Sequence, residues 1–291
     1  MRIKKTKNNN EYVSAGGIWV RDFTKENIPH VCISPMVEKK DYQKLLLNED
    51  INRHHNYTNV AEEKISVENV VIVSDGYEFD QKHLMLKDLP TNVYVFGVNR
   101  VIPKWKLMDL SLEQKRAINL YIVNNPYAEC LRYLPQSDMP YYPSCVASTR
   151  TNNDFINKYK GRLYFYEPTP ENTFGRAVRQ KYYIDDYRNP VCAAIDLAFH
   201  SGAKKIMLLC CDGSFEGKRE GATQLENGLY SYREHLILQE IVDAKAFWLN
   251  RFKTRKIKVA DHSSGGKYNN IPYINSQQEI VDFFTRSSEE A

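Results

Sequence analysis

The sequence lacks the short motifs that mark the common nucleotide-using and metal-using enzymes. It has no G-x-G-x-x-G and no G-x-x-x-x-G-K-[ST], which excludes the usual dinucleotide-binding loop and the P-loop. It also has no H-E-x-x-H and no G-x-S-x-G. The sequence therefore predicts neither the zinc site that the first motif forms nor the serine nucleophile that the second carries. None of the six cysteines forms a C-x-x-C pair, and we interpret Cys210 and Cys211, inside an apolar run, as buried thiols.

Long apolar runs and a strong net charge are also lacking. No run approaches the roughly 20 apolar residues of a membrane helix, and no signal-peptide stretch follows MRIKKTKNNN, so we expect a cytoplasmic protein without a membrane span. The net charge of +4 is too small to indicate a nucleic-acid partner. The 291 residues suffice for one large domain, or for a domain with an extension.

From residue 67 onward, short apolar runs recur at regular intervals. Each is rich in β-branched and aromatic residues and is followed by turn residues, which is typical of strands buried on both faces. The runs span residues 70–73, 93–98, 120–123, 162–166, 205–211 and 256–260.

Helical patterns lie between several of these runs. In NPVCAAIDLAFHSG, Asn189 is a good N-cap, Pro190 a good first residue and Gly202 a fitting stop. The alternation predicts a Rossmann-like α/β domain over residues 67–291, with a mostly parallel sheet and helices on both faces. Residues 1–66 show no period and are predicted to form an irregular N-terminal extension that packs on the main domain or on a partner.

Small polar residues follow most of the predicted strands. In a parallel sheet, ligands bind outside the carboxyl ends of the strands. Two Asn-Pro helix starts are expected there as well, and a helix N-terminus favours an anion. The predicted nucleotide-binding residues are Ser74, Asp75, Gly76, Asn99, Asn125, Asn189 and Asp212.

No metal site is predicted. His54 and His55 are adjacent in a polar stretch, which favours a solvated loop. Asp185 and Asp186 are also adjacent, and neighbouring side chains point in different directions unless the loop turns sharply.

Several of these stretches resemble a known group of proteins. RNPVCAAIDLAFHSGAKKIMLLCCDGSF (188–215) is similar to the domains related to archaeal 6-hydroxymethylpterin diphosphokinase and to the motility accessory factors of flagellin glycosylation. The chain also resembles the bacterial lipooligosaccharide sialyltransferases, with VVIVSDGYEF at the place of their glycine-containing first loop. The resemblance spans about residues 67–275 and carries nucleotide contacts over to Gly76, Asn99, Asn125 and Asp212.

The sequence departs from this pattern in two places. Asp75 and Glu78 bring negative charge to the first loop, and one glycine and a proline of the family's loop are missing. The sialyltransferases also have a histidine five residues before an aspartate that matches Asp243. Leu238 stands at that position here, and the nearest histidine is His235.

The resemblance implies a metal-independent glycosyltransferase that uses a nucleotide sugar of the CMP-sugar type and needs no cofactor. A histidine that titrates near neutrality suits the role of general base, and the two candidates are His235 and His262. Tyr230 and Tyr232 are expected to hydrogen-bond the leaving phosphate.

Two alternatives stay open. The first is a non-catalytic module that keeps the fold for an interaction, with residues 1–66 as the contact for a protein partner or for self-association. The second is an ATP-dependent diphosphokinase, in which Asp75, Asp185, Asp186 and Asp212 would hold magnesium.

Overall fold

The computed structural model describes most of the chain. The described residues are 3–5, 11–15, 18–21, 32–33, 39–54, 58–63, 65–106, 118–135, 142–168, 183–225, 227–250, 257–263, 268 and 270–286. None of the helices in these segments is both long and apolar enough to cross a membrane.

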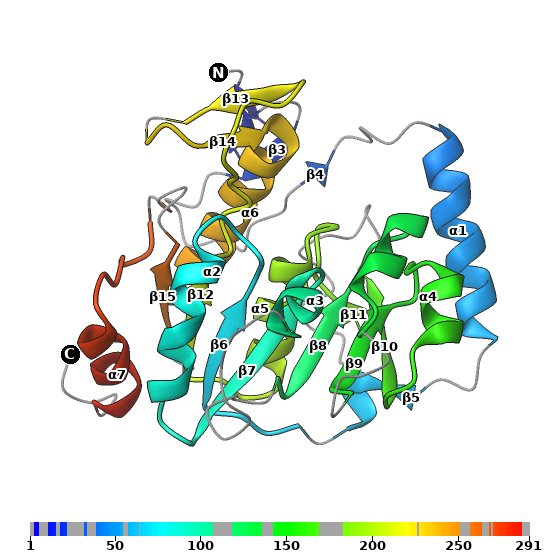
Figure 1. Ribbon diagram of the computed structural model, residues 1–291. Coiled ribbons are helices and arrows are strands. Elements are labelled where there is room, and N and C mark those ends of the chain that lie inside the picture. The colour runs from blue at the N-terminus through cyan, green and yellow to red at the C-terminus, as the bar shows by residue number, and fades with distance from the viewer. Residues whose placement is uncertain are drawn as a thin grey trace.

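A parallel sheet forms the centre of the molecule (Figure 1). Its strands lie in the order β11 (Tyr183–Ile184), β10 (Leu163–Pro168), β9 (Ser144–Ser148), β8 (Leu120–Val123), β7 (Val93–Val98), β6 (Asn69–Val73), β12 (Lys205–Leu209) and β15 (Lys258–His262). All pairings in this order are parallel, and β5 (Thr58–Asn59) pairs in parallel with β10 as well. The predicted Rossmann-like α/β fold is confirmed.

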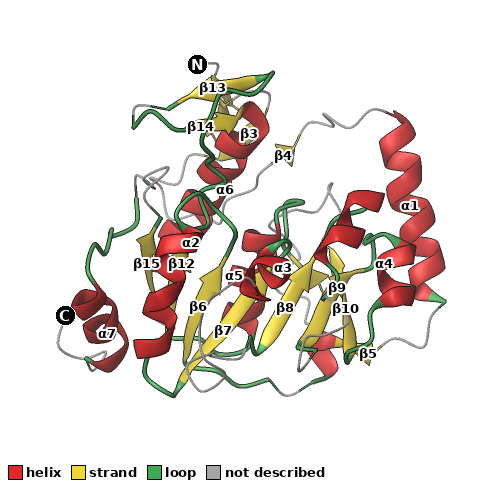
Figure 2. Ribbon diagram, viewed as in Figure 1, coloured by secondary structure: helices red, strands yellow, loops and turns green. Residues whose placement is uncertain are grey.

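Helices cover both faces of the sheet, as Figure 2 shows in red. One face packs against α5 (Pro190–His200) and α6 (Arg233–Asn250). The other packs against α2 (Phe79–Lys82), α3 (Val101–Lys106), α4 (Asn153–Lys158), α7 (Gln277–Thr285) and the 3-10 helices η2 (His83–Asp88) and η3 (Ala128–Tyr133). The two hydrophobic cores therefore lie on opposite faces of nearly continuous apolar strands.

The N-terminal 66 residues are more regular than expected. They contain α1 (Lys39–Arg53), the 3-10 helix η1 (Val60–Glu62) and a four-stranded antiparallel sheet of β1 (Ile3–Lys5), β2 (Glu11–Ala15), β3 (Ile18–Arg21) and β4 (Cys32–Ile33).

The helix α1 is held on the main domain by two asparagines. Asn52 Nδ2 donates to the carbonyls of Thr149 at 2.8 Å and Thr151 at 2.7 Å. Asn48 Nδ2 donates to the carbonyl of Pro126 at 3.1 Å. Polar contacts of this kind do not affect the spacing of apolar residues, so that spacing cannot predict them. Part of the predicted extension thus packs on the main domain, while association through residues 1–66 stays a prediction.

Two element predictions need correction. Asn125 does not cap an α-helix, because its Oδ1 accepts from the backbone N–H of Tyr127 at 2.8 Å and turns the chain there. A 3-10 helix follows, and its N-cap residue Tyr127 makes no side-chain cap bond. His262 was expected to follow the last strand, but β15 continues through it.

Candidate functional site

The strand order reverses direction between β6 and β12. From β6 the chain builds β7 to β11 on one side, and α5 then carries it back to β12 on the other side of β6. In open parallel sheets, ligands bind at the carboxyl ends of the strands that flank such a point. The candidate site therefore lies between residues 74–78, which follow β6, and residues 210–216, which follow β12. We refer to these two segments as the switch-point loops.

The two switch-point loops are joined by their own hydrogen bonds. The backbone N–H of Gly76 donates to the carbonyl of Cys210 at 3.0 Å. The hydroxyl of Tyr77 donates to Glu216 Oε1 at 2.5 Å, and this bond raises the pKa of Tyr77 above its usual value. Both loops are therefore held next to each other at one edge of the sheet.

Gly76 is needed for this close approach. A Cβ atom at this position would lie 2.5 Å from the carbonyl oxygen of Cys210 and 2.6 Å from Asp212 Oδ1. Gly76 is a predicted nucleotide-binding residue, and these contacts show that the missing side chain makes room for the neighbouring loop. A larger residue would force the switch-point loops apart.

The acidic side chains of the first loop are paired with cations. Asp75 Oδ2 lies 2.8 Å from an Arg100 guanidinium nitrogen, and the Asp75 carbonyl accepts from Lys104 Nζ at 3.3 Å. Glu78 Oε2 lies 2.5 Å from Lys82 Nζ. The negative charge that we expected to repel a phosphate is thus balanced by a cation at each position.

Three buried polar atoms at this edge make no hydrogen bond within the described structure. They are Asn99 Oδ1, Ser214 Oγ and Asp261 Oδ2. Buried polar groups normally have partners, so such a concentration is unusual and is a reason to place a polar site at this edge. Asn99 is held in the left-handed region at a φ of 45°, and its carbonyl accepts from the hydroxyl of Tyr121 at 2.6 Å.

His235 lies beside the second switch-point loop. It belongs to the first turn of α6, and its Nδ1 is 3.1 Å from the carbonyl oxygen of Gly213. Gln239, one turn further along α6, donates to the carbonyl of Asp212. The ring of Tyr232 meets the imidazole edge-on at 5.6 Å between centroids. The helix therefore holds His235 at the loop that follows β12.

Two carboxyl groups lie buried at the ends of neighbouring strands. Asp212 accepts from the backbone N–H of Ser214 at 3.2 Å, and Asp261 accepts from that of Ser263 at 3.0 Å. Burial, and then the charge of Asp212, raise the pKa of Asp261 to about 8, although the hydrogen bonds from Ser263 oppose this rise. Asp261 is therefore largely protonated at neutral pH.

His262 lies in a different setting. Its Nδ1 donates to the carbonyl of Ile274, and its Nε2 faces Met85 Sδ at 3.1 Å. The side chain is buried, which lowers the pKa of the imidazole. Its catalytic role stays a prediction, and of the two candidate histidines the geometry favours His235.

Asn125 and Asn189 make their hydrogen bonds within the protein. Asn125 Nδ2 donates to the hydroxyl of Tyr133 at 3.0 Å. Asn189 caps α5 as predicted, with its Oδ1 accepting from the backbone N–H of Val191 at 2.8 Å. Asn125 thus belongs to a turn and Asn189 to a helix cap. Contact with a nucleotide stays a prediction for both residues.

The adjacent acids before α5 are both buried. Asp185 accepts from the hydroxyl of Tyr187 at 3.0 Å, and Asp186 accepts from that of Tyr166 at 2.9 Å. No group of three or more His, Cys, Asp or Glu residues in the described segments is arranged to hold a metal ion.

The sequence prediction missed the residues that set the charge and shape of the site. Arg100 directly follows Asn99 at a strand end, and that position was a usable signal. Glu216 contacts Tyr77 of the first switch-point loop and Gln239 contacts Asp212 of the second, and the patterns of their segments indicate neither contact.

The fold is similar to that of a solved glycosyltransferase. Neither a scan against protein-family models nor a search of curated proteins finds a match. Among solved structures, the MAf glycosyltransferase from Magnetospirillum magneticum AMB-1 has a similar fold, with a TM-score of 0.56 and 11% sequence identity. The similarity covers 81% of this chain and 38% of that protein. The chain therefore shares its fold with part of that protein and spans well under half of its length.

Proposed function

We propose that the protein binds a nucleotide sugar at the switch-point loops and transfers its sugar to a hydroxyl group. The observation that carries this proposal is the meeting of residues 74–78 and 210–216 at the topological switch point, with His235 beside them. The glycosyltransferase-like fold supports it. The proposed donor is of the CMP-sugar type, and we propose that the reaction needs no metal, because Asp75 and Glu78 have cationic partners and Asp261 is largely protonated.

The polar atoms at this edge suit a nucleotide. Asn99 Oδ1 is an acceptor and Ser214 Oγ can donate or accept, and neither makes a hydrogen bond within the described structure. A nucleobase edge or a ribose offers complementary groups to such a pair. Arg100 is 61% exposed and adjoins the first switch-point loop, where it can turn from Asp75 to a phosphate.

His235 is proposed as the general base. A neutral imidazole that donates Nδ1–H to the carbonyl of Gly213 carries its lone pair on Nε2. Nε2 would take the proton of the acceptor hydroxyl as that oxygen bonds to the anomeric carbon. The bond from this carbon to the phosphate oxygen breaks, and the nucleoside phosphate leaves with the electron pair.

We expect CMP to stabilise the protein without magnesium. A ligand at 100 times its dissociation constant raises the free energy of unfolding by about 2.7 kcal/mol, which a melting curve detects. Asp75→Asn should increase the shift, because it releases Arg100 from its ion pair and removes a negative charge. Arg100→Gln should decrease it.

The same melting curves separate the alternatives. A shift with ATP that requires magnesium would indicate a diphosphokinase. If no nucleotide shifts the wild type or Asp75→Asn at millimolar concentration, the enzyme proposal is wrong and the non-catalytic module takes its place.

We expect His235→Gln to lose activity but keep nucleotide binding. Loss of a general base lowers turnover by about 10²–10⁴-fold, measured as release of CMP from a CMP-sugar. His54→Gln is a matched control, because His54 is exposed and its Nδ1 contacts only the carbonyl of Asp50 among the contacts described. Equal turnover in the wild type and His235→Gln would remove His235 from the mechanism.

A further inference from the structure

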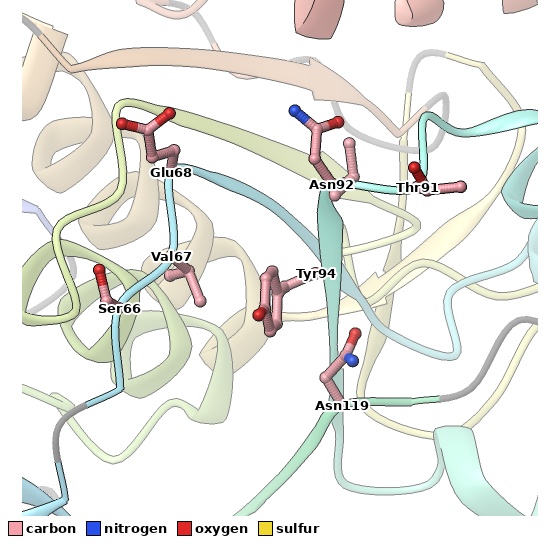
Figure 3. A pocket seen from close by; sticks show the side chains of 8 residues that line it. Ser66, Val67, Glu68, Thr91, Asn92, Tyr94 and Asn119 are labelled. Atoms are coloured by element: carbon pink, nitrogen blue, oxygen red, sulfur yellow. The ribbon is translucent and has the colours of Figure 1, made fainter.

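A hollow of about 550 Å³ lies at the opposite edge of the sheet, by the amino ends of β6 and β7 (Figure 3). Its size falls within the range of small-molecule sites. Six polar or aromatic side chains line it, together with Val67 and Val93. They are Ser66, Glu68, Thr91, Asn92, Tyr94 and Asn119.

Tyr94 is unusual for its place in the sheet. It shares a face of β7 with Phe96 and Val98, which are completely buried in the core beneath α5. The side chain of Tyr94 is nevertheless 39% exposed. The last turn of α5 ends near this edge, where the carbonyl of Ser201 accepts from the backbone N–H of Val67 at 3.0 Å. The helix layer thus stops short of Tyr94 and leaves an aromatic surface in the hollow.

Two of the polar side chains around Tyr94 have partners within the protein. Asn119 Oδ1 accepts from the backbone N–H of Val95 at 2.7 Å. Glu68 Oε1 pairs with Lys204 Nζ at 2.5 Å. Figure 3 shows Glu68, Asn92 and Asn119 on the lining of the hollow in which the ring of Tyr94 lies.

The charge of the hollow restricts what it can bind. Of the eight described residues that line it, Glu68 alone carries a charge, and that charge is negative. A phosphate or another anion would meet no cation on this lining, and the nearby Lys204 is already paired with Glu68. A neutral molecule with many hydroxyl groups fits better, because amides both donate hydrogen bonds to hydroxyls and accept them, and a carboxylate accepts them.

We infer that this hollow is a second ligand site, which binds a neutral saccharide against the ring of Tyr94. The face of a tyrosine ring carries partial negative charge and attracts the C–H groups on one side of a sugar ring. The hydroxyls at the sugar's rim would reach Glu68, Asn92 and Asn119. The site is separate from the switch-point loops and does not depend on the proposed nucleotide site.

Saturation-transfer NMR on the full chain tests this inference. The probes are the neutral trisaccharides maltotriose, cellotriose and N,N′,N″-triacetylchitotriose at millimolar concentration, with CMP as the probe of the other site. We expect saturation transfer to the ring C–H protons of at least one trisaccharide. Tyr94→Ala should weaken that binding at least about tenfold, whereas Tyr94→Phe should retain most of it because the ring remains.

Two further variants separate this site from the proposed nucleotide site. Asn92→Ala alters an exposed side chain and should weaken trisaccharide binding without affecting CMP. Arg100→Gln should affect CMP and leave the trisaccharide signal unchanged. The inference fails if the wild type shows no transfer to any of the three trisaccharides, or if Tyr94→Ala and Asn92→Ala bind them as the wild type does.

Discussion

Replacing Lys245 by methionine is expected to lower the free energy of unfolding by about 3–5 kcal/mol, the usual effect of removing one partner of a buried ion pair. Lys245 Nζ lies 2.9 Å from Asp196 Oδ1 and donates to the carbonyl of Asp185 at 2.6 Å. These bonds join α6 to α5 and to the turn before α5. Methionine keeps much of the side-chain volume but leaves Asp196 buried without its cation.

The charges around Asp196 explain the size of this effect. Burial alone would raise the pKa of Asp196, but the charge of Lys245 and the hydrogen bond with His200 outweigh burial and hold that pKa well below its usual value. Burial likewise opposes the charged form of Lys245, and the carboxylates of Asp196 and Asp185 raise its pKa above the usual range. Each charge is therefore stabilised in the interior mainly by the other.

Lys204→Met provides the matched control. It makes the same chemical change at an ion pair with Glu68 that is more than half exposed on both sides, where such pairs contribute less than about 1 kcal/mol. Urea denaturation of both variants at pH 7 gives the comparison. Equal losses in the two variants would show that the buried pair does not hold α6 against α5.

The sequence was most informative where apolar residues decide the structure. The run 93–98 is β7 and the run 120–123 is β8, because a strand buried on both faces must be apolar throughout. Asn189 and Pro190 start α5 as predicted, and Ser276 caps α7 with a reciprocal bond to Glu279. These features depend on neighbours close in sequence, so local patterns suffice to predict them.

Features that depend on contacts between distant segments could not be predicted in this way. The strand β9 begins and ends with serine, and it lies between β8 and β10 although its pattern is weak. The helix α1 is fixed by Asn48 and Asn52 through bonds to carbonyls about a hundred residues away. The candidate site also depends on distant contacts, because the carbonyl of Cys210, in the loop that follows β12, leaves no room for a side chain at Gly76.

The second large effect concerns Asp261, the buried acid at the end of β15. We expect Asp261→Asn to be more stable than the wild type at pH 8, with the difference shrinking as the pH falls. The pKa of Asp261 is raised from 3.8 to about 8 in the folded protein, first by burial and then by the charge of Asp212. The wild type must therefore either keep this group protonated or place a charge in the interior.

The sign of the effect follows from proton binding. Between pH 3.8 and about 8, the folded state holds a proton on Asp261 that the unfolded state has lost. The stability of the wild type then falls by about 1.4 kcal/mol for each pH unit across this window because of this group. Asparagine does not titrate, so the variant lacks this loss. Its Oδ1 can still accept from the backbone N–H of Ser263, and its Nδ2 offers a donor where Asp261 Oδ2 has no partner within the described structure.

Urea denaturation at several pH values between 4 and 8.5 measures the free energy of unfolding of the wild type and of Asp261→Asn. The difference between these two free energies cancels the titration of all other groups. Asp282→Asn is the control, because Asp282 pairs with an exposed Arg286 within one helical turn, so this substitution should change stability little.

A difference in stability that stays constant with pH would show that Asp261 is ionised throughout. A difference that grows with pH would mean that Asp261 remains protonated beside Asp212 at neutral pH. In that case a single negative charge, rather than two, lies at the carboxyl ends of β12 and β15, where the proposed nucleotide phosphate must approach.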